Sequence, residues 1–148
     1  MSSYLFFKYL HYVSIFLMVG SVFVQNFLIS KELTLKEIKR IAISDAIYGI
    51  SAIAVAVIGL VLWFGVGKGA DFYNMNFIFH IKIGLFFLIA IFSIAPTMFY
   101  LQNRKRLKEG QTVFVPRRLL FIVRIELILL FFIPLLAVLM ANGVGYFG

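Results

Sequence analysis

Four long apolar stretches, separated by short polar segments, constrain this chain more than any other feature. They cover residues 4–30, 41–66, 76–101 and 119–141. Each is long enough to cross the hydrocarbon core of a bilayer as a helix, which takes about 20 apolar residues. No β-barrel alternation is present, so helices are the way to satisfy their backbone groups in lipid. The sequence therefore predicts an all-α fold, an integral membrane four-helix bundle that forms one transmembrane domain over residues 1–148.

Composition agrees with burial in lipid. The chain is 63% hydrophobic and 14% charged, whereas a soluble domain is about 45–50% apolar and about 25% charged. The first apolar stretch exceeds the roughly 7–15 residues of a signal-peptide core and is expected to be a retained helix. The absence of cysteine excludes disulfides and thiolate metal sites. No phosphate-binding loop, dinucleotide-binding turn or catalytic triad motif is present.

The net charge of +8 is concentrated in two loops. Residues 31–40 carry four basic and two acidic side chains, and residues 102–118 carry six basic and one acidic. Short basic loops mark the cytoplasmic side of a membrane protein, so both termini and the turn at 67–75 are expected outside. Orientation and contact with lipid headgroups account for the charge, and nucleic acid is not an expected partner. Residues 33–40 are expected to form a short interfacial helix whose Leu35 and Ile38 side chains insert into the headgroup region.

Ionisable side chains inside the predicted spans form two levels, since such residues usually face the interior of a bundle. The outer level holds Lys8, His11, His80 and Lys82. His11 lies about seven residues into its span, or about 10 Å at 1.5 Å per residue, and Lys82 lies at a similar depth. Lys8, His11 and Gln25 recur on one stripe of the first helix, which is the predicted interior face.

The third span contains two candidate partners for His11, of which only one can face it. His80 and Lys82 are two positions apart, so they point about 160° from each other on a helix. Lys82 shares its face with Ser93 and is predicted to point inward, whereas His80 is predicted to face the interface or a neighbouring helix.

His11 has two interpretations. As a structural residue it would hydrogen-bond across helices or reach the interface, as Lys8 would by snorkelling. As an axial ligand it would hold a b-type haem between the first and third spans, because bundles build cofactor sites from facing side chains. The second iron ligand would be Lys82 or His80, and Lys8 would meet the haem propionates.

The inner level holds two polar residues on each of three spans, which are Gln25 and Asn26, Asp45 and Tyr48, and Arg124 and Glu126. Asp45 and Arg124 each lie about one turn inside the cytoplasmic boundary. We predict that they form an ion pair, which would neutralise two buried charges and fix the register of two helices. The alternative is a role in proton handling or substrate binding.

Several runs of sequence are similar to a known family. These are residues 41–49 (IAISDAIYG), 67–73 (GKGADFY), 92–97 (FSIAPT) and 133–141 (IPLLAVLMA). In this order they resemble a family of small predicted bacterial membrane proteins, a domain of unknown function, over nearly the whole chain. The resemblance implies a four-helix protein of the bacterial cytoplasmic (inner) membrane.

A more distant likeness involves Leu10-His11 and the run Phe79-His80-Ile81-Lys82. Both look like the haem-containing membrane protoporphyrinogen oxidase family of bacteria. There, a His of the first span and a Lys of the third are implicated in binding haem b, which implies His11 and Lys82 as iron ligands here. The tryptophan-rich pattern that follows the first His in that family is missing, so the likeness implies the haem more than the oxidase activity.

The sequence thus leads to two functional hypotheses. In the first, the protein binds haem b near its outer face and serves redox chemistry on a porphyrinogen or a quinone. In the second, it is a non-enzymatic accessory or assembly protein whose buried charges only fix its fold. In both, the lipid bilayer is a partner and a homo-oligomer is compatible with the sequence.

Overall fold

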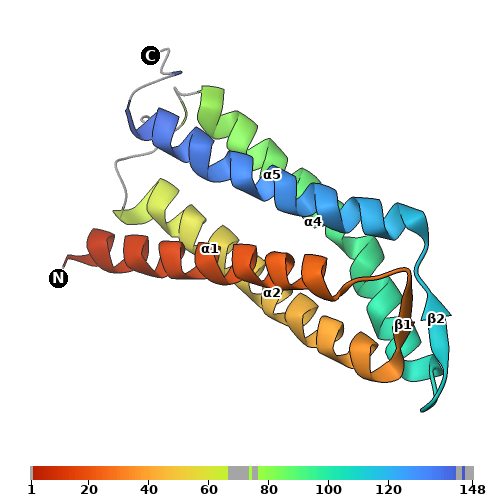
Figure 1. Cartoon of the computed structure of the whole chain (residues 1–148). Coiled ribbons are helices and arrows are strands. Elements are labelled where there is room, and N and C mark those ends of the chain that lie inside the picture. Colours follow the sequence, from red (N-terminus) through yellow and green to blue (C-terminus); the bar gives the residue numbers. More distant parts are fainter. Residues whose placement is uncertain (1, 67–73, 75–76, 143–144, 146–148) are drawn as a thin grey trace.

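The computed structural model describes residues 2–66, 74, 77–142 and 145. Four long helices run up and down along one axis (Figure 1): α1 (Ser3–Leu28), α2 (Leu35–Val61), α4 (Phe77–Arg106) and α5 (Arg117–Ala141). A π-helical turn, η1 (Leu62–Val66), continues α2. All four long helices have the length and composition to cross a membrane. This confirms the prediction of four apolar helices, although their bounds differ by several residues.

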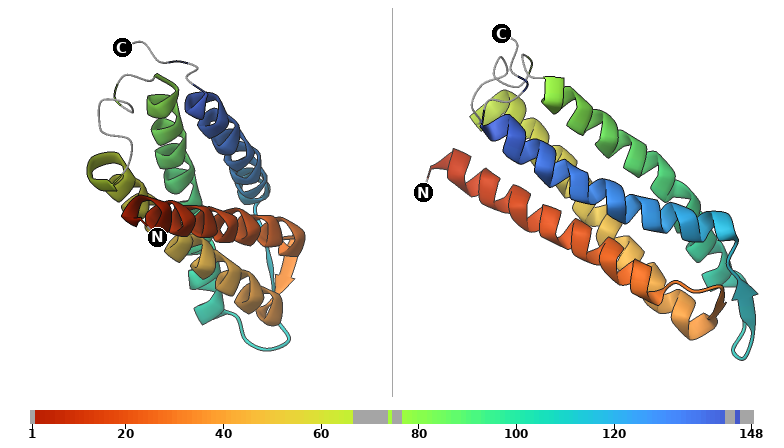
Figure 2. Two further views of the ribbon diagram at one scale, coloured as in Figure 1. Left: turned by 90° about the vertical axis from the view of Figure 1, so that its left-hand side faces the viewer. Right: turned by 45° about the horizontal axis from the view of Figure 1, so that its top comes forward.

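The helices form two hairpins that pack together. α1 packs mainly on α2, and α4 packs mainly on α5. Across the hairpins, α2 contacts α4 and α1 contacts α5, so α1 and α4 are placed diagonally in the bundle. The start of α1, η1, the start of α4 and the end of α5 lie at one end (Figures 1 and 2). We call this end the open end, and the opposite end, which carries the two short strands, the strap end.

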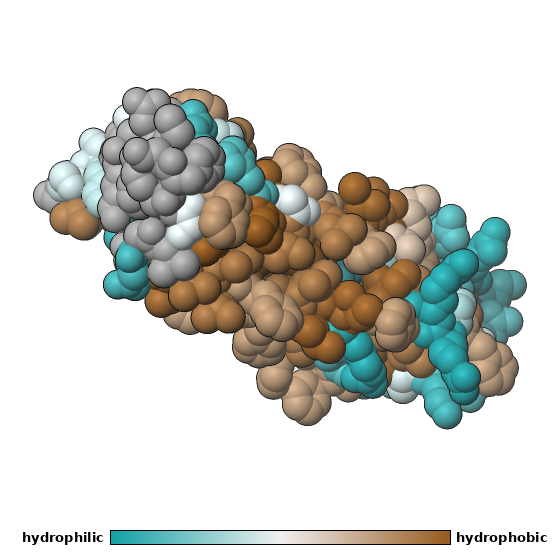
Figure 3. All heavy atoms as spheres, turned by 90° about the horizontal axis from the view of Figure 1, so that it is seen from above, coloured by the Kyte–Doolittle hydropathy of each residue, from teal (hydrophilic) through white to brown (hydrophobic). Residues whose placement is uncertain are grey.

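The surface of the bundle is apolar over its middle and polar at its ends. Figure 3 shows hydrophobic side chains along the helices and hydrophilic ones concentrated at the strap end. Large apolar side chains face outward along every helix, among them Phe16, Ile50, Ile91 and Phe131. An apolar exterior of this extent is suited to lipid and not to water.

The strap end differs from the sequence expectation. Two strands, β1 (Glu32–Thr34) and β2 (Thr112–Phe114), pair antiparallel with Leu33 opposite Val113. The backbone N–H of Val115 extends the pairing by donating to the carbonyl of Lys31 over 2.8 Å. The two predicted basic loops are therefore joined to each other in a short strap.

The predicted interfacial helix over residues 33–40 is wrong. α2 already begins at Leu35, because Thr34 and Glu37 form a capping box that satisfies the first free N–H groups of the helix. Ile38 is fully buried in protein and does not reach the headgroups. It belongs to an apolar cluster at the strap end that also includes Leu33, Ile41, Tyr100, Leu119 and Val123.

Two further apolar clusters continue the core along the axis. The middle one is formed by Met18, Val22, Tyr48, Ile89 and Leu130. The third lies at the open end and is formed by Ile78, Phe79 and Met140, with Trp63 packed against it. The expected outer turn at residues 67–75 lies, apart from Asn74, outside the described residues.

Candidate functional site

The outer polar level contains His11 and Lys82, whose charges interact through space. His11 projects from α1, and its ring atom Nδ1 is buried with no hydrogen-bond partner among the described residues. Lys82 projects from α4 and lies close enough to His11 for their charges to interact. On the α2 side, a Cβ atom placed on Gly59 would lie 3.5 Å from His11 Cε1. His11 therefore occupies a site between three helices.

Aromatic side chains line the α4 side of this level. The Nζ atom of Lys82 lies 5.6 Å from the centroid of the Phe79 ring, in the geometry of a cation–π contact. Phe79 is buried and meets the Trp63 ring edge to face at 4.8 Å. Trp63 in turn stacks on Phe64 at 4.4 Å. Both of these residues belong to η1, and π-helical turns are frequent at functional sites.

The other two basic residues of this level have different surroundings. His80 is exposed, and its Nε2 lies 3.0 Å from the backbone carbonyl oxygen of Asn74. Lys8 is half-buried near the start of α1, with Nζ 5.4 Å from the centroid of the Tyr4 ring. The structure thus has Lys82, and not His80, on the interior face, as the spacing from Ser93 indicated.

The inner polar level is a hydrogen-bonded network centred on Asp45. Its Oδ2 accepts from the Thr97 hydroxyl at 2.7 Å, and its Oδ1 is 3.4 Å from Nε2 of Gln25. The Tyr100 hydroxyl donates to Oε1 of Gln25 over 3.4 Å. Gln25 and Tyr100 are each only 1% exposed. The network connects α1, α2 and α4 in the interior of the bundle.

The predicted ion pair between Asp45 and Arg124 is wrong. Arg124 is exposed on α5 and forms no salt bridge with Asp45. Glu126 is the buried residue of this segment, at 1% exposure, and its charge interacts with that of Asp45. Two residues that are two positions apart on a helix point to nearly opposite faces, so only one of this pair can face inward.

Sequence analysis missed two members of the inner level, Thr97 and Tyr100. Both follow Ser93 at steps of four and three residues, which is the spacing of one helical face. This periodicity was the available signal. It was hidden because the hydroxyl groups stand within an otherwise apolar run.

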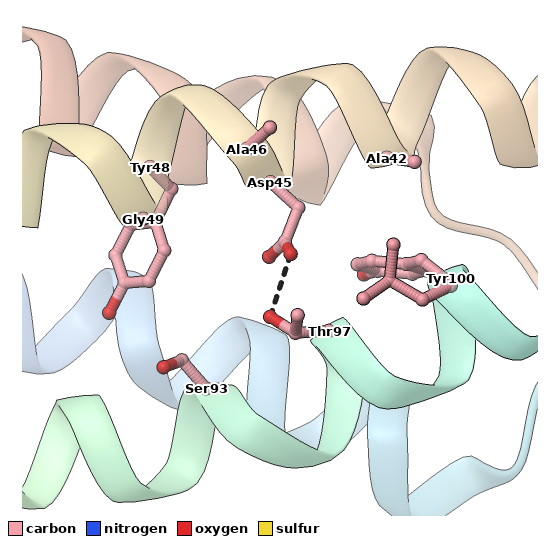
Figure 4. A pocket seen from close by; sticks show the side chains of 9 residues that line it. Ala42, Asp45, Ala46, Tyr48, Gly49, Ser93, Thr97 and Tyr100 are labelled. Atoms are coloured by element: carbon pink, nitrogen blue, oxygen red, sulfur yellow. Dashed lines mark hydrogen bonds between the residues drawn. The ribbon is translucent and has the colours of Figure 1, made fainter.

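A cavity of about 240 Å³ opens beside the network, between α2 and α4. It is lined by Ala42, Asp45, Ala46, Tyr48, Gly49, Ser93, Thr97, Tyr100 and Leu101. Figure 4 shows the Tyr48 and Ser93 hydroxyl groups directed into the space between the two helices. The Tyr48 hydroxyl is buried without a hydrogen-bond partner among the described residues, as is Oε1 of Glu126.

The described residues contain no cluster of three or more His, Asp or Glu side chains with the arrangement of a metal site.

Comparison with known proteins identifies a family but no activity. No curated protein matches the chain, and no solved structure matches it. The distant likeness to membrane protoporphyrinogen oxidase finds no support in these comparisons. The sequence pattern of one family, described as predicted membrane protein (DUF2214), matches residues 3–145. The chain therefore belongs to the DUF2214 family of predicted membrane proteins.

Proposed function

We propose that this protein binds b-type haem between α1 and α4, near the open end of the bundle, and serves redox chemistry in the membrane. One observation carries the proposal: the buried Nδ1 of His11 has no hydrogen-bond partner among the described residues, and Lys82 lies at the same level. Buried polar atoms are nearly always paired, so an orphaned imidazole nitrogen calls for a ligand or another explanation.

The donor set fits haem iron. Imidazole is a common axial ligand of haem iron, and the amine of Lys82 carries a lone pair when neutral. The two side chains come from helices that are placed diagonally in the bundle. Bundles build cofactor sites in this manner. Lys8 lies three residues before His11, nearer the membrane surface, where it would meet a propionate.

The chain's own residues would hold and enclose the cofactor. His11 and Lys82 would bind the iron, and Phe79 and Trp63 would exclude water on the α4 side. When bound, haem would supply a one-electron redox centre, and a porphyrinogen or a quinone would be the substrate.

An absorption spectrum tests this proposal. The full chain, produced with ample haem and purified in mild detergent, should show a Soret band and reducible b-type features. His11→Ala should abolish the band, and Lys82→Ala should weaken or shift it. His80→Ala is the matched control and should leave the spectrum unchanged, because His80 is exposed and contacts Asn74. A colourless wild-type protein at near-stoichiometric haem would refute the proposal.

We also propose the orientation and the compartment. The strap end carries the basic segments, and positively charged loops mark the cytoplasmic face. Both termini would then lie outside, in the cytoplasmic (inner) membrane of a bacterium. The outer level would face away from the cytoplasm, and the inner level would face it.

A second candidate function is supported by the inner network. Gln25, Asp45, Thr97 and Tyr100 hydrogen-bond to one another across three helices without needing a ligand. Such a network fixes the packing of a bundle and suits a non-enzymatic accessory or assembly protein. This becomes the better account if the protein binds no haem.

A further inference from the structure

We infer that the cavity between α2 and α4 binds the headgroup of a lipid-soluble quinone that enters from the bilayer. The inference rests on the proposed redox function, because that function gives a bound quinone its role. Of the two proposed substrates, a porphyrinogen and a quinone, it selects the quinone. Binding itself is measured without haem, so the two ideas fail separately. Size, shape, polarity and access of the cavity carry the argument.

The size and shape of the cavity suit a single flat ring. Its volume of about 240 Å³ is below the roughly 300–1,000 Å³ of pockets for drug-sized ligands. A porphyrin macrocycle therefore does not fit this cavity. Its α2 wall combines the small residues Ala42, Ala46 and Gly49 with the side chains of Asp45 and Tyr48. The small residues leave room for a flat ring beside these two polar side chains (Figure 4).

One unused hydrogen-bond donor is directed into the cavity. The Tyr48 side chain is 3% exposed, and its hydroxyl lies beside that of Ser93. It is not within hydrogen-bonding geometry of Ser93 or of any other described residue. The neighbouring hydroxyl protons are already used, since Thr97 donates to Asp45 and Ser93 donates to the Ala90 carbonyl over 2.7 Å. An unpaired hydroxyl at membrane depth is costly. A ligand carbonyl oxygen would accept the Tyr48 proton and remove that cost.

Access to the cavity is from the lipid side. Ala46 and Leu101 line it and are exposed on the outer surface of the bundle. An occupant that arrives this way has to dissolve in hydrocarbon, be small and flat, and carry an oxygen acceptor. An acyl chain meets the first requirement but leaves the Tyr48 hydroxyl unpaired. A quinone headgroup meets all of them.

The experiment measures binding of a short-chain ubiquinone analogue to the purified full chain in lipid nanodiscs. Titration calorimetry gives the affinity, and a photoreactive azido derivative maps the site by mass spectrometry. Cross-links are expected in α2 and α4 around Gly49 and Ser93. Cross-links confined to other helices, or no binding above that of protein-free nanodiscs, would overturn the inference.

Two variants with matched controls test the cavity itself. Gly49→Leu fills it, and a new Cβ there meets nothing within 4 Å, so the fold should persist while binding falls at least tenfold. Gly84→Leu, equally free of contacts, should bind normally. Tyr48→Phe should weaken binding about three- to tenfold, the effect of one hydrogen bond. Tyr12→Phe, on an exposed ring, should not.

The outcomes separate this inference from the haem proposal. Unchanged binding in a folded Gly49→Leu variant overturns the site, and unchanged binding in Tyr48→Phe overturns the role of its hydroxyl. A haem spectrum recorded on the same samples is the second readout. Colourless protein that binds the quinone at this cavity refutes haem and keeps the site. Haem-loaded protein that binds no quinone supports the haem proposal and refutes the quinone site.

Discussion

Glu126 is the most unusual residue of the bundle, because it places a carboxyl group in the membrane interior with 1% exposure. Asp45 is nearby, and neither forms an ion pair with another described residue. Asp45 differs in that Thr97 and Gln25 hydrogen-bond to it. Buried charge without a counter-ion is expensive in lipid. The inner level therefore depends on Asp45 for its hydrogen bonds, and Arg124 contributes nothing to it.

A stability measurement distinguishes these residues. Asp45→Ala should lower the free energy of unfolding by about 1–3 kcal/mol, because buried donors on Gln25 and Thr97 lose their acceptor. Arg124→Ala changes an exposed side chain and should stay within about 0.5 kcal/mol of wild type. Unfolding in mixed micelles, followed by circular dichroism, measures both. Equal losses of unfolding free energy in the two variants would indicate an ion pair between Asp45 and Arg124 and would contradict the structure.

The same residues show how far sequence reasoning reached. Depth and helical facing selected Lys82 over His80, because Ser93 marked the interior side of that span. The same two-residue argument separates Glu126 from Arg124, but nothing in the fourth span marked its interior face. Charge complementarity with Asp45 favoured Arg124, and it was misleading, since hydrogen bonds from neutral groups satisfy the carboxylate instead.

At the scale of elements, the four helices were predictable and the strap was not. Each helix is specified by a local run of apolar residues. β1 and β2 are three residues long and about eighty positions apart in the chain, so neither has a local turn or alternation signal. The strap also changes the interpretation of residues 33–40, which were expected to lie in the headgroup region. Leu33 is fully buried beneath the strand pair instead.

A disulfide tests the register of the strap. Glu32 and Phe114 are paired across the strands, and the chain contains no cysteine of its own. Paired Cα atoms in an antiparallel ladder lie about 4.5–5.5 Å apart, within the range that a disulfide bridges. Mild oxidation of the double variant Glu32→Cys/Phe114→Cys should form the bond quickly, as seen by non-reducing electrophoresis. Glu32→Cys/Lys108→Cys, outside the strand register, should oxidise slowly, and equal rates would contradict the pairing.

At the scale of the whole molecule, the asymmetry of charge along the axis is the main feature. One end carries the strap with most of the basic side chains, and the apolar middle contacts lipid. If the positively charged end faces the cytoplasm, as we propose, this charge asymmetry sets which polar level faces which compartment. The outer level would then be accessible from outside the cytoplasm, and the cavity between α2 and α4 would lie nearer the cytoplasmic leaflet.

Reporter fusions test the orientation. A reporter inserted at Gly110, an exposed position with φ of 84° just before β2, should be active only in the cytoplasm. A reporter fused after Gly148 should be active only outside. The positive-charge bias of the loops is the physical reason for both expectations. A cytoplasmic signal from the fusion after Gly148 would contradict the proposed orientation. The level that contains His11 would then face the cytoplasm.

The strap also determines where the two helical hairpins are held together. It joins the two hairpins by main-chain hydrogen bonds at the strap end, so a rotation of one hairpin against the other about this point would move the distant open end most. His11 is 17 residues from Leu28, the last residue of α1 at the strap end, which is about 26 Å at 1.5 Å per residue. A rotation of about 5° at the strap end displaces a group at that distance by about 2 Å. His11 and Lys82 belong to different hairpins. A ligand held by both side chains would therefore also limit how far the two hairpins can separate at the open end.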